Sequence, residues 1–157
     1  GGFLTCGPKV EEFEKAVCDY TNATYGVAVS NGTAALHIVC LTLGLKEGDE
    51  VIVPAITFAA SSNCVLYTGA KPVFCDVEED TLNIDCNLIE GLITENTKAI
   101  IAVDMGGQLC DYHRLRDICN KHNLVFILNS IGWNRWLECV APPTCIPNAH
   151  NTSRFCQ

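Results

Sequence analysis

Short apolar runs alternate with amphipathic segments along this chain. The runs are rich in Val, Ile, Leu, Ala and Phe, which is typical of strands that are buried on both faces of a sheet. The segments between them repeat apolar residues at the spacing of one helix face. The pattern predicts strands at 25–29, 51–53, 71–77, 98–103 and 124–128, and helices at 8–19, 33–43, 57–67, 87–93 and 112–122.

The alternation of strands and helices favours an α/β fold. Parallel strands need long crossover connections, and the helices that supply them come to cover the sheet. We therefore expect a mostly parallel sheet with helices on both faces. The chain has 157 residues, which suits one domain with a core of its own.

The pattern ends near Leu128. Residues 131–157 show no periodicity and hold three prolines, three cysteines and both tryptophans. We predict that residues 1–130 form the folded domain and that residues 131–157 are an atypical tail outside it. A reading-frame shift or a mis-predicted exon would produce such a break.

The net charge of −8 argues against nucleic acid or an anionic membrane as a partner. No apolar run approaches the roughly 20 residues of a membrane span, and the first residues lack the features of a signal peptide. We therefore expect a cytoplasmic protein. A small phosphate ligand stays compatible with the charge, because backbone amides bind phosphate without basic side chains.

The eleven cysteines form no CxxC pair and have no histidines at zinc-ligand spacing. A thiol inside a helix or strand behaves as a small hydrophobic group. We expect reduced, structural thiols and no metal site, with a cysteine-based metal or redox protein as a weaker alternative. The positions inside predicted helices or at a strand end are Cys18, Cys40, Cys64, Cys75 and Cys119.

One turn has features that favour phosphate binding. Ser30, Asn31 and Gly32 join the predicted strand at 25–29 to a helix that opens at Thr33. The free N–H groups of a first helical turn and the helix dipole both attract an anion. The same residues also describe an ordinary turn in which Thr33 is the N-cap and nothing binds. The residues alone leave both interpretations open.

Five segments carry a resemblance to a known family, in the same order: FLTCGPKVEEFEKA, YGVAVSNGTAALH, GDEVIVPAITFAASSNCVLYTGAKPVFCDV, TLNID and TKAIIAVDMGGQLCDYHRL. Together they resemble the DegT/DnrJ/EryC1/StrS family of sugar aminotransferases, which use pyridoxal 5'-phosphate (PLP). The resemblance runs from Phe3 to Ile127 and implies a truncated large domain of the PLP-transferase type I fold. It also implies a nucleotide-linked 4-keto sugar as substrate, glutamate as amino donor and a homodimeric enzyme, with the pseudaminic acid branch the most similar.

The resemblance assigns four cofactor-binding residues. Gly32 and Thr33 match the turn that holds the cofactor phosphate, and Phe58 matches the aromatic side chain that stacks on the pyridine ring. Asn129 stands where the family has an aspartate that pairs with the pyridine nitrogen. Asn31 is a weaker candidate beside the turn. The remaining polar residues of interest are expected to be structural: His37, Gln108 and Asp111.

Two departures from the family lead to a prediction of inactivity. An asparagine can hydrogen-bond to the ring nitrogen but supplies no charge. The lysine that binds the cofactor covalently has no counterpart either, because no lysine follows position 121. We expect an aminotransferase N-terminal part with no catalytic residue of its own, which binds PLP weakly at most. The alternative is a non-catalytic sugar-nucleotide or nucleotide-binding α/β module, although neither GxGxxG nor GxxxxGK[ST] is present.

Overall fold

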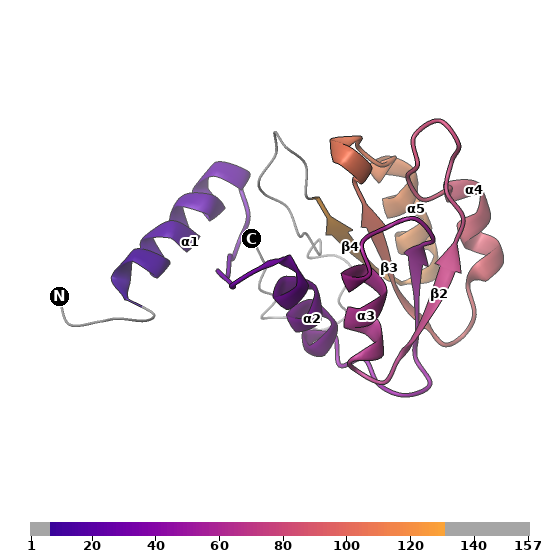
Figure 1. Cartoon of the computed structure of the whole chain (residues 1–157), viewed down its shortest axis with the longest axis horizontal. Helices are drawn as coiled ribbons and strands as arrows, with labels where there is room; N and C mark the ends of the chain where they lie inside the picture. Colours follow the sequence, from indigo (N-terminus) through magenta and orange to yellow (C-terminus); the bar gives the residue numbers. More distant parts are fainter. Residues whose placement is uncertain (1–6, 131–157) are drawn as a thin grey trace.

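The computed structural model describes residues 7–130, and the predicted tail at 131–157 lies outside them. Four strands form one sheet in the order β2-β1-β3-β4 (Figure 1). All three strand pairings are parallel. This confirms the expected α/β fold. The strands are β1 (Glu50–Pro54), β2 (Lys71–Cys75), β3 (Thr97–Val103) and β4 (Val125–Asn129).

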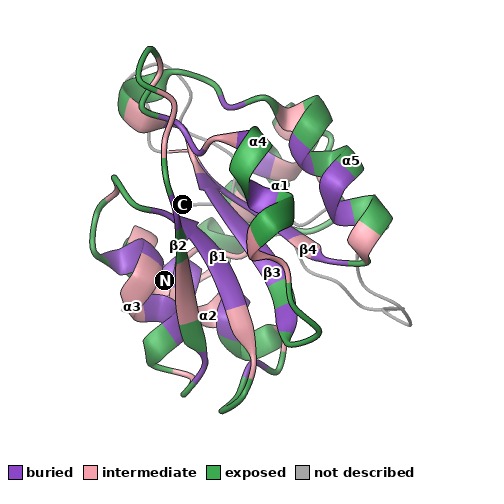
Figure 2. Ribbon diagram, turned by 90° about the vertical axis from the view of Figure 1, so that its right-hand side faces the viewer, coloured by how far each residue is buried: buried purple, intermediate pink, exposed green. Residues whose placement is uncertain are grey.

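Helices cover both faces of this sheet, as expected. The helices α2 (Gly32–Thr42) and α3 (Ala60–Leu66) pack on one face. The other face carries α4 (Cys86–Ile89), the 3-10 turn η1 (Glu90–Leu92) and α5 (Tyr112–His122). Figure 2 shows β1, β3 and β4 mostly buried between these two layers, whereas the outer strand β2 is largely exposed or intermediate.

Alternation of side chains along the strands divides the core into two parts. Val51, Val53, Ala99, Ile101 and Ile127 pack under α2 and α3. Their neighbours in sequence pack under α4 and α5 instead; these are Ile52, Ile100, Ala102, Phe126 and Leu128. Both sets are apolar because both faces of the sheet are covered, which explains the continuous apolar runs in the sequence.

The first helix, α1 (Pro8–Thr21), lies to one side of the sheet (Figure 1). Val17 is its only buried residue. The predicted strand at 25–29 beside it is wrong, because these residues join no strand of the described sheet. The Ala28 N–H donates instead to Glu14 Oε1 of α1, at 2.8 Å. An apolar run favours a strand, but a strand forms only where a neighbour supplies the backbone partners.

Three other predicted elements differ from the structure at their ends. The helix expected from residue 57 begins at Ala60, so Phe58 lies in the connection before it. The helix expected at 87–93 is α4 followed by η1. The strand expected to reach residue 77 ends at Cys75, beyond which the chain turns into an excursion that closes with a single bridge between Val77 and Ile84.

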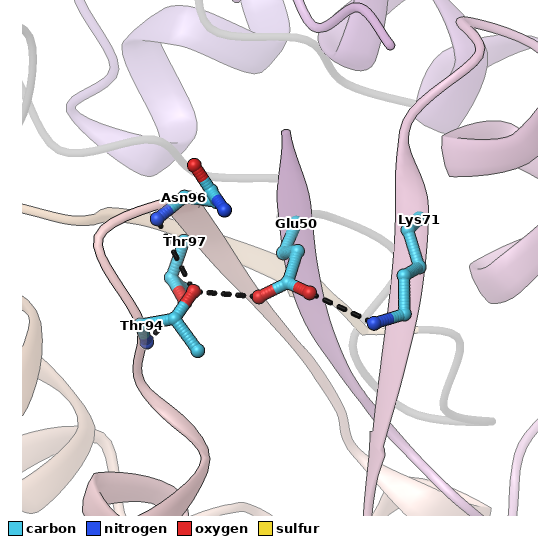
Figure 3. Close-up of polar contacts among 5 residues, drawn as sticks. All are labelled: Glu50, Lys71, Thr94, Asn96 and Thr97. Carbon is cyan, nitrogen blue, oxygen red and sulfur yellow. Dashed lines mark hydrogen bonds and ion pairs between the residues drawn. The ribbon is translucent and has the colours of Figure 1, made fainter. Parts of the chain in front are cut away.

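Polar contacts tie the amino end of the sheet together (Figure 3). The Glu50 carboxylate accepts a hydrogen bond from Thr94 Oγ1 at 2.6 Å and pairs with Lys71 Nζ at 2.9 Å. The Thr97 hydroxyl accepts from the Thr94 N–H at 2.9 Å. The pairing of β1 with β3 shifts by one residue here, between Glu50 and Val51. The network therefore stabilises the irregular start of the sheet at its amino end. The loops that lead from the strands into the helices lie at the opposite end.

None of the helices in residues 7–130 combines the length and the apolar character needed to cross a bilayer.

Candidate functional site

The carboxyl end of the sheet gathers the residues that the sequence singled out. The strands are parallel, so the connections after β1, β3 and β4 all begin at this end. The helix α2 starts there too, because residues 43–49 lead from its last residues straight to the first residue of β1. This is the place where ligands bind in open parallel sheets.

Asn31 caps the first turn of α2. Its side-chain Oδ1 accepts from the Ala34 N–H at 2.9 Å, and the helix begins at Gly32. The expectation that the helix opens at Thr33, or that Thr33 is the N-cap, is therefore wrong. The Asn31 side chain reaches the N–H of the third helical residue, and asparagine is among the best N-cap residues. The cap leaves the N–H groups of Gly32 and Thr33, ahead of the first helical hydrogen bond, for another acceptor.

Gly32 is half-buried and Thr33 is exposed at this helix start. The α2 dipole places partial positive charge at the same point. An anion that reaches the turn meets two N–H groups and the Thr33 hydroxyl. The geometry of a phosphate site is thus present, although α2 is an ordinary capped helix in every other respect.

Phe58 lies in the connection between β1 and α3 and is 75% exposed. Its carbonyl accepts from the Ser61 N–H at 3.0 Å, which anchors the backbone at the start of α3. The neighbouring Thr57 and Ser61 hydroxyls bond to each other at 2.9 Å. An aromatic ring held on a fixed backbone but left in solvent is available to stack on a flat ligand.

Asn129 is the last residue of β4 and is only 4% exposed. Its Oδ1 is buried and has no hydrogen-bond partner among the described residues. Val125 and Ile127 face the layer of α2 and α3. Because side chains alternate along a strand, Asn129 faces that layer as well. A buried amide oxygen without a donor costs about 1–3 kcal/mol, so its presence calls for a ligand or a compensating role.

The four candidates therefore share one end and one face of the sheet. Gly32 and Thr33 begin α2, Phe58 precedes α3, and these two helices pack side by side on the face toward which Asn129 points (Figure 1). Phe58 follows β1 and Asn129 ends β4, with β3 between them. The strands β1 and β4 are two strand spacings apart, which is about 10 Å.

The residues expected to be structural have structural contacts. His37 packs edge-to-face on Tyr67, with ring centroids 5.1 Å apart. Asp111 caps α5 by accepting from the Arg114 N–H at 3.1 Å. The backbone carbonyl of Gln108 accepts from the Asn83 side chain at 3.0 Å, and the Gln108 side chain is exposed.

The lysines lie away from this end. The described residues hold all six lysines of the chain. Lys71 and Lys98 begin β2 and β3 at the amino end, where they pair with Glu50 and Asp49. Lys46 and Lys121 lie shortly before β1 and β4, near the same amino end. Lys9 and Lys15 lie on α1. No lysine in the described part of the chain stands at the carboxyl end of the sheet.

The thiols pack rather than react. The seven cysteines in the described part form no disulfide with one another, and all but Cys18 are buried. Burial raises the pKa of Cys75 and of Cys86 to about 11, and it raises the pKa of Cys110 as well. These thiols therefore stay protonated at neutral pH. Within residues 7–130 no cluster of His, Cys, Asp and Glu is arranged to hold a metal ion.

Two buried polar residues near this end were missed from the sequence. Asp104 directly follows β3 and is 2% exposed, and Asn83 lies in the excursion after β2 and is 3% exposed. The available signal was an aspartate at the end of an apolar strand, which marks the carboxyl end of a parallel sheet. Asn83 gave no signal, because it lies in a loop without periodicity.

Comparison with known proteins gives one family. Residues 1–130 match the DegT/DnrJ/EryC1/StrS aminotransferase family. GDP-perosamine synthase of Caulobacter vibrioides is 45% identical over 121 residues, which are 77% of this chain and 33% of that protein. Spore coat polysaccharide biosynthesis protein SpsC of Bacillus subtilis is 42% identical over 127 residues, 81% and 32% of the two chains. The chain thus spans about a third of the length of these curated relatives.

Solved structures agree with the sequence relatives. NtdA of Bacillus subtilis with the bound cofactor PMP matches with a TM-score of 0.77 at 42% identity, over 79% of this chain and 28% of that chain. Spr1654 of Streptococcus pneumoniae, in its PLP form, matches with a TM-score of 0.77 at 37% identity, over 83% of this chain and 36% of that chain. The similarity therefore covers the same part of the chain as the fold described above.

Proposed function

This chain belongs to the DegT/DnrJ/EryC1/StrS aminotransferase family, and from that premise we propose that the carboxyl end of its sheet is the N-terminal part of a PLP site. The whole protein would transfer an amino group from glutamate to a nucleotide-linked 4-keto sugar, as a homodimer. The single observation that carries the proposal is the buried Asn129 Oδ1, which has no hydrogen-bond partner among residues 7–130 and lies at the end where the other candidate residues meet.

The residues present fit the cofactor in kind. The N–H groups of Gly32 and Thr33, with the Thr33 hydroxyl, would hold its phosphate at the start of α2. Phe58 would cover the pyridine ring, and Asn129 Oδ1 would accept from the protonated ring nitrogen. When bound, PLP supplies an electron sink for chemistry at the amino group. The chain's own part is to bind the phosphate and to orient the ring.

Asn129 offers the ring nitrogen an uncharged hydrogen-bond acceptor. A carboxylate about 4 Å from a pyridinium contributes on the order of 4 kcal/mol at an effective dielectric near 20, and an amide lacks that Coulomb term. The chain also has no lysine at this end of the sheet in its described part. We therefore propose that the chain alone binds PLP without a covalent bond and does not catalyse transamination.

The test is a binding titration of the full chain with PLP, pyridoxal and a UDP-sugar, in which equilibrium dialysis measures the bound ligand. We expect PLP to bind at least about tenfold more tightly than pyridoxal, because only PLP carries the phosphate that the α2 turn would hold. Equal affinities for the two would contradict the phosphate site. A UDP-sugar that binds while PLP does not would favour a nucleotide-binding module instead.

Phenylalanine variants give a matched control. Phe58→Ala is expected to weaken PLP binding, whereas Phe74→Ala removes a comparably exposed ring on the edge strand β2, at 56% exposure, and is expected to leave it unchanged. Equal effects would show that the ring at 58 has no special role. Borohydride treatment in the presence of PLP, followed by peptide mapping, tests whether PLP binds without a covalent bond. A single fully labelled lysine would contradict non-covalent binding.

A further inference from the structure

Two buried polar side chains and one partly buried tyrosine hold the loop after β3, next to the strand that carries Asn129. They are Asn83, Asp104 and Tyr112, and we call this set the carboxyl-end clamp. Asn83 and Asp104 are among the few buried polar residues of the described chain, at 3% and 2% exposure. Most buried polar groups in proteins are hydrogen-bonded, and these two are.

Asn83 holds both ends of one turn. Its Oδ1 accepts from the Met105 N–H at 3.0 Å, and its Nδ2 donates to the Gln108 carbonyl at 3.0 Å. The turn between them is η2 (Met105–Gly107), in which Gly106 and Gly107 have positive φ. One amide group thus fixes a turn whose glycine backbone has little rigidity of its own.

The chain adopts a costly conformation to bring Asn83 to this turn. Leu82, the residue before it, has φ of 58°, in the left-handed region that non-glycine residues rarely occupy. The excursion is closed locally, by the Glu78 N–H on the Asn83 carbonyl and the Leu82 N–H on the Glu78 carbonyl, both at 2.9 Å. The excursion and η2 lie together at the same end of the sheet (Figure 1).

Asp104 holds the other side of the loop. Its Oδ1 accepts from the Cys110 N–H at 3.0 Å, and its Oδ2 accepts from the Tyr112 hydroxyl at 2.5 Å. Its own N–H donates to the Asn129 carbonyl at 3.1 Å. Asp104 therefore contacts the start of α5 through its carboxylate and the last residue of β4 through its backbone N–H.

We propose that the carboxyl-end clamp positions Asn129 and the 105–110 loop for the ring of a bound cofactor, an inference that rests on the proposed function. Asn83, Asp104 and Tyr112 act as positioning residues, because their contacts go to the loop and to the backbone of Asn129. The buried Asn129 Oδ1 is the group so positioned, and within residues 7–130 it has no hydrogen-bond partner, unlike the side chains of Asn83 and Asp104.

The first test needs no ligand. Hydrogen exchange at the Asp104 amide reports the bond to Asn129 directly. Asn83→Ala and the milder Tyr112→Phe are expected to speed this exchange by about tenfold through local opening. Glu50→Ala is the matched control, because it also removes two side-chain contacts, but at the amino end of the sheet. Unchanged exchange in both clamp variants, or equal acceleration in the control, overturns the proposal.

The second test measures PLP affinity in the same full-length variants. Both clamp variants are expected to weaken PLP binding by about fivefold, the net value of roughly one hydrogen bond, while Glu50→Ala binds as the parent does. If the parent binds PLP and the clamp variants bind it equally well, this inference alone fails. If the parent chain binds no PLP, the proposed function fails and the inference fails with it.

Discussion

Replacing Asn129 with leucine should make the free chain more stable and its cofactor site worse. Asn129 is 4% exposed, and its Oδ1 has no partner in the described structure. Leucine has nearly the same length and no polar atom. The change removes a desolvation cost of about 1–3 kcal/mol without disturbing the backbone, whose carbonyl still accepts from the Asp104 N–H.

The expected gain is about 1–2 kcal/mol in the free energy of unfolding, since a slightly larger side chain costs part of the benefit. With a urea slope of 1–3 kcal/mol/M for a domain of this size, the midpoint should rise by roughly 0.5–1 M. PLP affinity should fall by about five- to tenfold in the same protein, because the ring nitrogen loses its acceptor. This is the usual opposition between stability and function at a ligand site.

Urea denaturation followed by circular dichroism measures the first effect, and PLP titration measures the second. Asn87→Leu is the control, because the Asn87 side chain is exposed and already bonds to Asp85 and Arg114, so it should gain nothing. A destabilised Asn129→Leu chain would show that Oδ1 has a partner in solution. The explanation of Asn129 as a ligand-binding group would then be wrong.

Three further predictions follow from single contacts. Phe58→Ala should change the free energy of unfolding by less than about 0.5 kcal/mol, measured in urea, because the ring is already in solvent. The Thr94 hydroxyl and then Lys71 hold the pKa of Glu50 below its usual value of 4.5, so its stabilisation is complete above that value and is lost as the pH falls through the lowered pKa. Acid titration of unfolding should accordingly show the parent and Glu50→Gln converging at low pH; a constant difference would refute this. Iodoacetamide labelling with peptide mapping at pH 8 should modify Cys18 and spare Cys110, whose pKa is raised by burial.

The hydrophobic pattern predicted most of the fold because the sheet is buried on both faces. Three of the four strands, β1, β3 and β4, are largely apolar runs, and the run itself is the signal. The segment at 25–29 has the same composition yet forms no strand in the described chain, since pairing depends on a neighbour that composition does not reveal. Its Ala28 N–H finds the Glu14 side chain instead.

The candidate site was predicted less completely. Gly32, Thr33, Phe58 and Asn129 were assigned from the resemblance to the family, and the structure brings them to one end and one face of the sheet. Their roles toward a ligand stay predictions. The carboxyl-end clamp was not predicted, because Asn83 lies more than twenty residues from Met105 and Gln108, and contacts of that range leave no periodic trace in a sequence.

The two outer strands of the sheet differ in a way that bears on self-association. The outer strand β2 begins with Lys71 and Pro72, a cation and a residue without an N–H, which discourage another strand from adding to it. The opposite outer strand, β4, reads VFILN and has neither device, and no described strand lies beyond it. Within residues 7–130 its outer backbone groups pair with no other strand, so we expect fibrillar assembly of this chain to start from Val125–Asn129.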